Sequence, residues 1–450
     1  MSLRERLSNT NTDEQPKLAS NGHGMLNSAY QELKKTIHQT VLDRIDLERI
    51  QKHGEERLKK ELELLVERIV DEEKIALNQN ERRNLLLDIQ YEMLGYGPLE
   101  PLLKDPGISD ILVNTYKQVY IERQGKLELT DVTFQDNAHL LKIIEKIVSR
   151  IGRRVDESSP MVDARLPDGS RVNAIIPPLA IDGPILSIRR FAVNPLTVND
   201  LLKYKSITPP MAQLLQSLAQ AKINMLISGG TGSGKTTLLN VMSGFIPENE
   251  RIVTIEDAAE LQMRQPHVVR LETRPPNIEG QGEVTQRALV RNSLRMRPDR
   301  IILGEVRGPE ALDMLQAMNT GHDGSLATIH ANSPRDAISR LENMVSMAAS
   351  NLAARAIRQQ IASAITVIIQ VSRLTDGGRK IISIQEITGM EGDMITMHEI
   401  FTFKQLGVTE DQKIKGHFAA TGIRPQFTER LRTYGVPVPD SLFDPTKTYE

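Results

Sequence analysis

The chain has 450 residues, more than one ordinary domain, so we expect two or three domains joined by linkers. Its 56 Lys and Arg residues nearly balance 58 Asp and Glu, and the formal net charge of −2 argues against a protein that binds nucleic acid through a basic coat. The absence of Trp removes a main base-stacking side chain, and the absence of Cys excludes disulfides, thiolate metal sites and cysteine nucleophiles. We therefore expect no nucleic-acid partner and a reducing compartment.

No segment has the length and apolarity of a membrane span. The best apolar run, residues 361–371, is only about half of the roughly 20 residues that cross a bilayer. The amino-terminal residues lack the apolar core of a signal peptide. We expect a soluble, cytoplasmic protein without direct membrane insertion, whose association with a membrane runs through partner proteins.

The amino-terminal part changes character once. Residues 1–25 are polar with almost nothing to bury, which predicts a disordered tail. In residues 26–95 apolar residues recur at helical spacings of three and four, which predicts a three-helix bundle. One such run is Leu58, Leu62, Leu65 and Ile69. The bundle is either a solvated appendage or a module that docks a partner.

Residues 96–192 hold short runs rich in β-branched residues around one amphipathic helix, which predicts a small α/β domain. The expected strands are 108–114, 119–123, a third ending at Phe134, 161–166, 171–176 and 184–191. Residues 193–210 are expected to form a linker, because the prolines at Asn194-Pro195 and Pro209-Pro210 interrupt helix and strand.

From residue 211 to residue 450, short apolar runs alternate with helical stretches, as in a sheet that is covered on both faces. The strand runs are 223–228, 252–255, 301–303, 326–329 and 367–371. This alternation predicts an α/β fold with a largely parallel sheet. Such sheets bind ligands at the carboxyl ends of their strands.

The first of these strands leads directly into GGTGSGKT, residues 229–236, which matches the phosphate-loop pattern G-x-x-x-x-G-K-[ST]. Glycines let backbone N–H groups turn toward phosphate oxygens, and the following helix presents its positive amino end to the same anions. The alternative is a glycine-rich turn that merely joins strand and helix. The residues predicted to bind nucleotide are Gly230, Thr231, Gly232, Ser233, Gly234, Lys235, Thr236 and Thr237. Lys235 would reach the outer phosphates and Thr236 would hold Mg²⁺.

Acidic residues follow the next two strands. Glu256, Asp257 and Glu260 come after the strand 252–255, and Glu305 comes after the strand 301–303. Fast hydrolysis needs one carboxylate to orient the attacking water and another to steady the metal. We expect the acids to meet the phosphate loop, with Glu305 on the hydration shell of Mg²⁺. The alternative for the first three is to cap the next helix.

Two histidines flank the strand 326–329, because His322 precedes it and His330 follows it. Without Cys, two histidines make a poor zinc site, so we expect them to sense the γ-phosphate or to hydrogen bond to the waters of the metal. The alternative is a structural role for each.

Arginines cluster in the small domain and recur in the catalytic half. They are Arg165, Arg171, Arg189 and Arg190, followed by Arg270 and Arg274. One account is a set of surface salt bridges, each worth little. The other is that Arg171, Arg189 and Arg190 reach across a subunit boundary to the triphosphate, because transition-state charge needs an arginine and the phosphate loop supplies only a lysine.

Four ordered stretches resemble the type II/type IV secretion ATPase superfamily of traffic motors: GGTGSGKTT, IEDAAE, LGEVRG and TGHDGSLATIHANSP. In that family they are the Walker A, Asp box, Walker B and His box. The resemblance implies a RecA-like P-loop ATPase domain, a smaller N-terminal PAS-like α/β domain, and ATP and Mg²⁺ as substrate and cofactor. It also implies that Glu260 is the catalytic glutamate, Glu305 the Walker B glutamate, and His322 and His330 the box histidines.

Segments outside this core, such as VDARLPDGSRVNAI and RLETRPPN, resemble the Tad (Flp) pilus assembly branch. The lack of Cys argues against the branches that carry a four-cysteine zinc motif. The resemblance implies a homo-oligomer, a hexamer, that powers assembly of a type IV pilus through inner-membrane platform proteins, with retraction left open. The alternatives are a conjugation or type IV secretion motor, a DNA-translocating RecA-type ATPase, and a nucleotide-gated scaffold that does not hydrolyse.

Overall fold

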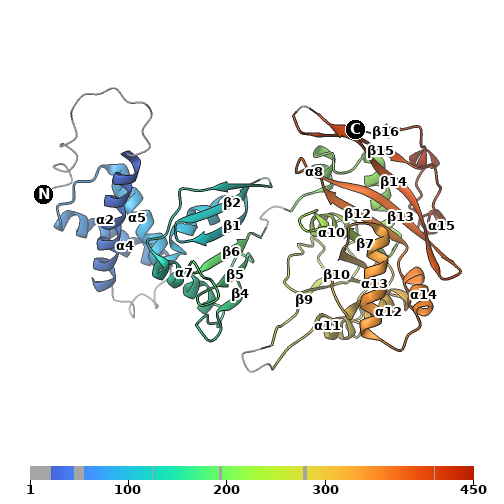
Figure 1. Cartoon of the computed structure of the whole chain (residues 1–450), viewed down its shortest axis with the longest axis horizontal. Coiled ribbons are helices and arrows are strands. Elements are labelled where there is room, and N and C mark those ends of the chain that lie inside the picture. Colours follow the sequence, from blue (N-terminus) through green and yellow to red (C-terminus); the bar gives the residue numbers. More distant parts are fainter. Residues whose placement is uncertain are drawn as a thin grey trace. The chain divides into compact units, whose positions relative to one another are not determined.

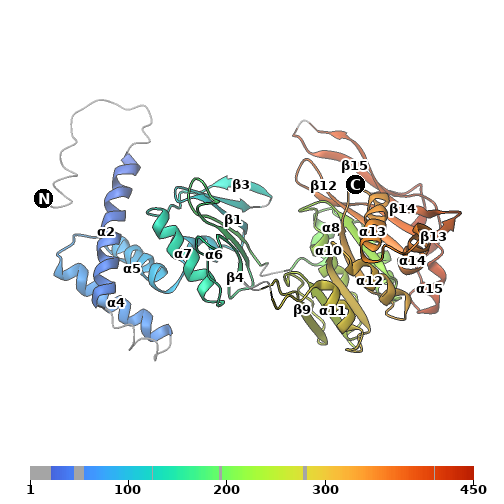
Figure 2. The same cartoon turned by 60° about the horizontal axis from the view of Figure 1, so that its bottom comes forward.

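The computed structural model describes residues 22–44, 55–123, 125–191, 195–276, 281–409 and 411–449. The chain divides into two compact units, residues 1–193 and residues 194–450. Figure 1 shows the two units, and Figure 2 shows them after a turn of 60°. The mixed α/β fold class that the sequence predicts is confirmed.

The described part of the first unit begins with the helices α2 (Gly22–Arg44), α4 (Glu55–Glu72) and α5 (Gln79–Leu94). Their apolar stripes meet in a shared core of buried side chains, which are Ile37, Val41, Leu62, Val66, Ile69, Val70, Leu85 and Ile89. Asn78 and Glu81 form a capping box that satisfies backbone donors at the start of α5. Of the tail predicted at 1–25, residues 1–21 lie outside the described residues, and the rest begins α2.

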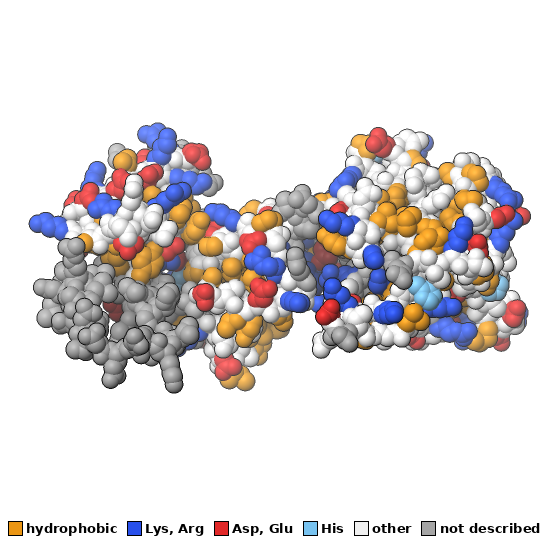
Figure 3. All heavy atoms as spheres, turned by 90° about the horizontal axis from the view of Figure 1, so that it is seen from above, with side chains coloured by type: hydrophobic (Ala, Val, Ile, Leu, Met, Phe, Trp, Pro, Cys, Tyr) orange, Lys and Arg blue, Asp and Glu red, His pale blue; other side chains and the backbone are white. Residues whose placement is uncertain are grey.

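Charged side chains cover the outside of these helices. On the face that Figure 3 shows, basic and acidic side chains alternate over the helical part of the first unit. Arg44 pairs with Glu72 at 2.5 Å, and Arg82 pairs with Asp71 at 2.9 Å. Within the described parts of the chain, no helix is both long and apolar enough to cross a membrane.

A buried carboxylate joins these helices to α7 (Asn137–Ser149) of the same unit. Glu92 Oε1 lies 2.8 Å from Lys34 Nζ, and Glu92 Oε2 lies 2.9 Å from His139 Nε2. The Glu92 side chain is only 4% exposed. Burial by itself raises the pKa of Glu92, but the hydrogen bond from His139 and the charge of Lys34 outweigh burial and lower the pKa to about 2.

Replacing Glu92 by Gln should lower the free energy of unfolding by roughly 3 kcal/mol at pH 7, because the buried Lys34 ammonium loses its counter-charge. The Glu92 carboxyl ionises near pH 2 in the folded chain and near pH 4.5 otherwise. Its contribution is therefore complete above pH 4.5 and is lost as the pH falls toward 2. Urea unfolding at pH 7 and pH 3 measures both effects.

The matched control is Glu72→Gln, which removes one carboxylate of an exposed pair and should cost less than about 1 kcal/mol. Equal stability of the two variants at pH 7 would contradict the anchoring role of Glu92.

The remainder of the first unit is a six-stranded antiparallel sheet with the order β3-β2-β1-β6-β5-β4. Its strands are β1 (Ile108–Thr115), β2 (Gln118–Arg123), β3 (Lys126–Leu129), β4 (Met161–Arg165), β5 (Arg171–Ile175) and β6 (Ile185–Arg189). The short helices η1 (Gly97–Leu99) and α6 (Glu100–Lys104) precede it, and α7 shares its core. The predicted third strand ends earlier than expected, and Phe134 is buried in the loop beyond it.

The predicted linker, residues 193–210, contains the helix α8 (Val198–Lys203) and the start of α9 (Pro209–Gln220). The Thr197 and Thr208 side chains accept hydrogen bonds from backbone N–H groups in the first turns of α8 and α9. The prediction that the proline pair interrupts helical structure is wrong for a physical reason. A proline in the first turn of a helix gives up an N–H that has no helical partner there, so the proline pair begins α9 instead of interrupting it.

The second unit is built on a 10-stranded sheet with the order β16-β15-β14-β13-β12-β7-β11-β10-β8-β9. Its strands are β7 (Met225–Gly229), β8 (Ile252–Glu256), β9 (Val268–Glu272), β10 (Arg300–Val306), β11 (Leu326–His330), β12 (Val367–Arg373), β13 (Arg379–Glu391), β14 (Met394–Val408), β15 (Ile414–Ala420) and β16 (Thr448–Tyr449). Neighbouring strands are parallel throughout the set β12, β7, β11, β10, β8 and β9. The pairs from β12–β13 to β15–β16 are antiparallel. The sheet is therefore mixed, and the prediction of a largely parallel sheet missed the hairpins that extend it.

Successive residues of the central strands pack on opposite faces of this sheet. Ile227 and Ile302 face a core that contains α9 and α10, whereas Leu226 and Leu303 face a core that contains α11 to α14. The helices are α10 (Lys235–Ser243), α11 (Gln286–Ser293), α12 (Glu310–Asn319), α13 (Pro334–Ala348), α14 (Ala354–Ala364), α15 (Thr428–Thr433) and η2 (Asp440–Phe443). With both faces covered, the carboxyl ends of the strands are left for polar residues.

Candidate functional site

The phosphate loop joins β7 to α10 and needs glycine at defined points. Gly232 has φ +67° and Gly234 has φ +99°, in the left-handed region that favours glycine. A Cβ on Gly229 would lie 2.5 Å from both Ser233 Oγ and the Val371 carbonyl oxygen, so no other residue fits there. Ser233 Oγ donates to the Gly230 carbonyl oxygen at 2.8 Å, which closes the loop on itself.

Lys235 begins α10, and its side chain folds back under the loop. Its Nζ donates to the carbonyl oxygens of Gly229 at 3.0 Å and Gly230 at 2.9 Å, and it lies 3.4 Å from His330 Nε2. Burial lowers the pKa of Lys235, and the nearby Glu305 charge offsets part of this effect. Neutral carbonyl groups hold the ammonium here, and phosphate oxygens would bind it more strongly because they are charged acceptors.

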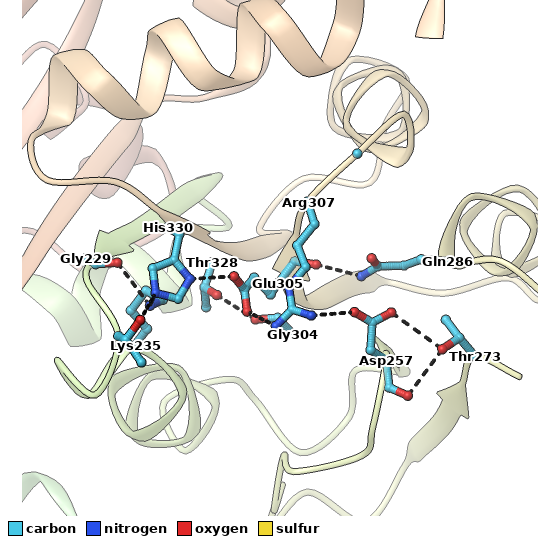
Figure 4. A network of polar contacts seen from close by, with 12 residues as sticks. Gly229, Lys235, Asp257, Thr273, Gln286, Gly304, Glu305, Arg307, Thr328 and His330 are labelled. Atoms are coloured by element: carbon cyan, nitrogen blue, oxygen red, sulfur yellow. Dashed lines mark hydrogen bonds and ion pairs between the residues drawn. The ribbon is translucent and has the colours of Figure 1, made fainter. Parts of the chain in front are cut away.

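His330 connects the loop to the acid that follows β10. Its Nδ1 lies 2.7 Å from Glu305 Oε1, and its Nε2 lies 2.9 Å from Thr231 Oγ1. Figure 4 shows His330 between Lys235 and Glu305. Burial raises the pKa of Glu305, but hydrogen bonds from Arg307 and His330 outweigh it and leave the pKa below its usual value. Glu305 is therefore ionised at neutral pH.

Arg307 bridges two acids at this edge of the sheet. Its Nη2 donates to Glu305 Oε2 at 2.7 Å, and its Nη1 donates to Asp257 Oδ2 at 3.2 Å (Figure 4). Asp257 also accepts a hydrogen bond from Thr273 Oγ1 at 3.5 Å. Sequence reasoning missed Arg307. Its place two residues after Glu305 was a usable signal, because an arginine so close to the carboxylate that is expected to hold the metal would compete with the metal for that carboxylate.

Glu256 has a different task from the predicted nucleotide contact. Its side chain is buried, and its Oε2 accepts the backbone N–H groups of Glu260 at 2.7 Å and Leu261 at 3.0 Å. The alternative of a helix cap is also wrong, because residues 257–267 form a loop. Burial raises the pKa of Glu256 to about 6, partly opposed by these two hydrogen bonds. Glu256 thus positions the backbone that carries Glu260.

The stability of the folded chain should depend on the protonation of Glu256. Its pKa is about 6 in the folded chain against 4.5 for the ordinary group, so the folded state binds the extra proton between these values. The free energy of unfolding therefore falls as the pH rises from 4.5 through 6, by about 2 kcal/mol from this group. Glu256→Gln keeps an acceptor without the charge and should lack this decrease.

Urea unfolding of both chains at pH 5 and pH 7.5 measures the difference. The control is Glu283→Gln, an exposed carboxylate in another loop of the same unit, which should keep the wild-type pH dependence. An unchanged pH dependence in Glu256→Gln would contradict this assignment.

Three arginines stand in a row across the sheet of the first unit. Arg165 pairs with Arg171 across β4 and β5, and Arg171 pairs with Arg189 across β5 and β6. Arg189 Nε lies 3.5 Å from Asp110 Oδ1, and its side chain is 58% exposed. Neighbouring arginines across strands concentrate positive charge on one face of the sheet, and although Asp110 offsets part of it, the row suits an anion.

Two other predicted arginines bond to backbone carbonyl oxygens of their own unit. Arg190 Nη1 donates to the carbonyl oxygens of Leu102 at 3.1 Å and Asp105 at 2.7 Å, just after α6. These contacts hold the Arg190 side chain against a segment 85 to 88 residues away, and its predicted phosphate contact stays a prediction. Arg274 Nε donates to the Gly282 carbonyl oxygen at 2.6 Å.

The structure does not bring His322 to this network. His322 precedes β11, whereas His330 ends it, so the two histidines flank the strand at opposite edges of the sheet. Within the described residues, His322 Nδ1 is buried without a hydrogen-bond partner, and the neighbouring Asp323 pairs with Arg430 at 3.0 Å. Of the two histidines, only His330 lies at the phosphate loop, and its contact with a nucleotide stays a prediction.

The hairpin between β12 and β13 also touches the phosphate loop. Arg379 Nε donates to the Gly232 carbonyl oxygen at 2.9 Å, a contact that joins residues 147 positions apart. No local pattern near residue 379 could have signalled this contact.

The residues at the start of α10 suit a hydrated magnesium ion. Within the parts of the chain that the structure describes, no group of three or more His, Asp or Glu side chains is placed to hold a metal ion. The Thr236 hydroxyl and the Glu305 carboxylate are hard oxygen donors of the kind that Mg²⁺ takes together with waters and phosphate oxygens. Thr237 follows in the first turn of α10. The residues present therefore fit Mg²⁺ that arrives with a nucleotide.

Comparison with known proteins gives a family and several relatives. A family model described as type II/IV secretion system protein matches residues 92–418. A putative conjugal transfer protein of Mycobacterium tuberculosis is 39% identical over 310 residues, which are 68% of this chain and 88% of that protein. The type IV secretion system protein VirB11 of Brucella suis is 32% identical over 273 residues, 55% of this chain and 76% of the relative. A crystal structure of the Brucella suis VirB11 ATPase in complex with sulphate shares 30% identity, with a TM-score of 0.35 over 64% of this chain and 94% of the other.

Proposed function

The chain belongs to the type II/IV secretion ATPase superfamily, and from this premise we propose that it is a ring-forming motor that hydrolyses ATP to power assembly of a Tad-type pilus. The observation that carries the proposal is the meeting of Lys235, His330 and Glu305 at one edge of the sheet. Each comes from a different strand end, and a phosphate-binding lysine next to an ionised glutamate is what nucleotide hydrolysis requires.

In the proposed mechanism, the chain's own groups bind the triphosphate and activate a water molecule. The loop N–H groups and Lys235 bind the outer phosphates, and Lys235 exchanges its two carbonyl partners for them. Glu260, held by the backbone contact to Glu256, accepts a proton from the attacking water. His330 holds Glu305 next to the phosphate loop, because it bonds to both Glu305 and Thr231 of the loop.

Mg²⁺ would be held by Thr236 and, through water, by Glu305. Bound there, it would supply positive charge beside the outer phosphates.

Phosphate release and ATP binding, measured together, distinguish Lys235, which is expected to bind ATP, from Glu260, which is expected to catalyse its hydrolysis. Lys235→Ala should reduce phosphate release at least about 100-fold and weaken ATP binding, because it removes the charge under the loop. Glu260→Gln should reduce release by a similar factor and leave ATP binding within about threefold, because only proton transfer is lost. A colorimetric phosphate assay together with binding of a fluorescent ATP analogue measures both quantities.

The control for both is Glu248→Gln, an exposed carboxylate in the same unit. Wild-type rates in both test variants would refute the enzymatic assignment.

We infer that the active unit is a hexamer and that Arg171 and Arg189 complete the site of a neighbouring subunit. The row of neighbouring arginines on the first unit supports this, because their concentrated positive charge suits a triphosphate, and the Arg189 side chain is 58% exposed. Arg189→Ala and Lys235→Ala chains should each be inactive alone. Mixed, they should regain activity, since a Lys235-intact subunit can take its arginine from a Lys235→Ala neighbour.

The mixing is done by denaturing and refolding the two chains together, with phosphate release as the readout. Absence of recovery, with mixed oligomers confirmed by mass spectrometry, would contradict action across the subunit boundary.

A conjugation or type IV secretion motor is the second candidate, favoured by the names of two relatives, a putative conjugal transfer protein and VirB11. Both candidates place the chain at the cytoplasmic face of an inner membrane, held there by platform proteins. The two candidates differ in the machine that the motor powers. A strain that lacks the gene should lose its pili if the chain is a pilus motor, and should lose conjugal transfer or secretion if it is a conjugation or secretion motor.

A further inference from the structure

We propose that Arg307 is a catalytic residue that acts within its own subunit, by moving its guanidinium from Glu305 and Asp257 onto the outermost phosphate of bound ATP. This inference rests on the proposed ATPase function and adds a source of positive charge that is independent of the arginines of the first unit.

The position of Arg307 supports contact with the phosphates. Its guanidinium joins the acid that ends β10 to the acid after β8, at the edge of the sheet that carries the phosphate loop. Lys235 and Glu260 lie close enough to act on it electrostatically. The arginine is therefore placed among Lys235, Glu260 and Glu305, which the proposed mechanism uses, and Asp257.

The Arg307 side chain can move while its backbone stays fixed. The backbone N–H groups of Arg307 and Gly308 both donate to Glu310 Oε1 at 2.7 Å, and Glu310 is buried at the start of α12. The Arg307 side chain, in contrast, is 57% exposed. The pair with Asp257 is largely exposed and therefore weak, whereas Glu305 is only 20% exposed, so the contact with Glu305 is the larger cost of the move.

The exchange of partners is favoured by charge. A terminal phosphate carries more negative charge than one carboxylate and matches the planar fork of a guanidinium. Without a cation between them, Glu305 and Asp257 would repel the incoming triphosphate. When Arg307 turns to the phosphate, Glu305 is also freed to hold a water of the metal.

The chemical step balances with groups that are already named. The oxygen of water bonds to the γ-phosphorus as the bond from that phosphorus to the bridging oxygen of ADP breaks. The electron pair of the broken bond stays on ADP, and the proton of the water passes to Glu260. Arg307 forms no covalent bond, and its charge stabilises the phosphoryl group as it transfers.

The test compares Arg307→Ala and Arg307→Lys with wild type. Arg307→Ala should lower kcat about 100-fold or more, with the KM for ATP within about threefold. Arg307→Lys keeps the charge without the fork and should stay at least about tenfold below wild type. The control is Arg355→Ala, an exposed arginine of the same unit that pairs with Asp393, and it should keep wild-type kcat.

A second readout distinguishes a catalytic role from a structural one. Arg307→Ala should bind ADP within about threefold of wild type, but it should lose at least about 30-fold in affinity for ADP with aluminium fluoride, which imitates the transferring phosphoryl group. Added guanidinium ion should restore part of the kcat of Arg307→Ala and none of that of Lys235→Ala.

Three results would overturn the proposal: a kcat within threefold of wild type, a raised KM with an unchanged kcat, or equal loss of ADP and ADP–aluminium fluoride binding. The last result would mean that Arg307 only maintains the structure. A wild-type chain that releases no phosphate would refute the proposed function itself, whereas active wild type with active Arg307→Ala refutes only the role of Arg307.

Discussion

The contact of His330 with Glu305 and with the loop above Lys235 depends on the parallel pairing of three adjacent strands. β11 lies between β7 and β10, and its register sets His330 opposite Gly229, the residue that opens the phosphate loop. Because neighbouring side chains on a strand point to opposite faces, a shift of one residue would turn His330 away from both partners. The apolar alternation that fills the cores on both faces of the sheet therefore also fixes the geometry at its edge. Stability and chemistry share one constraint here, since the residues that hold the register are buried and the residues that act are at the strand ends.

Charge balance is the second feature that the site depends on. Asp257, Glu260 and Glu305 gather where a triphosphate would bring further negative charge, and Lys235 and Arg307 are the cations among them. Lys235 is tied to neutral carbonyl groups and Arg307 to carboxylates, and in the proposed mechanism both exchange these partners for phosphate. The deeply buried Glu256 stays outside this exchange, because it is bonded to backbone N–H groups and not to a cation. In this proposal Lys235 and Arg307 change partners, whereas Glu256 keeps the backbone of the site in place.

Local patterns in the sequence predicted the parts of the site that are set by neighbours in the chain. The phosphate loop, Glu305 near the end of β10 and His330 at the end of β11 each stand at the carboxyl end of a short apolar strand, and parallel strands of one sheet bring such ends together. What the sequence could not reveal depends on the direction of a side chain or on a distant contact. Glu256 and Asp257 are adjacent carboxylic residues, yet one points into the protein and the other meets Arg307. Arg379 reaches the loop only because β12 and β7 are neighbours, and the prolines of the expected linker begin a helix because a threonine caps it.

The two sets of arginines would divide the work of a motor between a subunit and its neighbour. Arg307 follows β10, which is separated from the strand of the phosphate loop by β11, and it is present whenever its own subunit is folded. In the proposed mechanism it neutralises the acids and contacts ATP without a neighbouring subunit. The row of Arg165, Arg171 and Arg189 belongs to the other unit and gathers positive charge that suits an anion, although Arg189 already pairs with Asp110. If that anion is the triphosphate of an adjacent subunit, closing the ring around ATP is itself favourable, and reopening follows the loss of charge when phosphate departs. Hydrolysis would then drive motion through the electrostatics of one subunit interface. Arg307 would set the rate of hydrolysis within a subunit, and the row of Arg165, Arg171 and Arg189 would determine when a neighbouring subunit closes on its ATP.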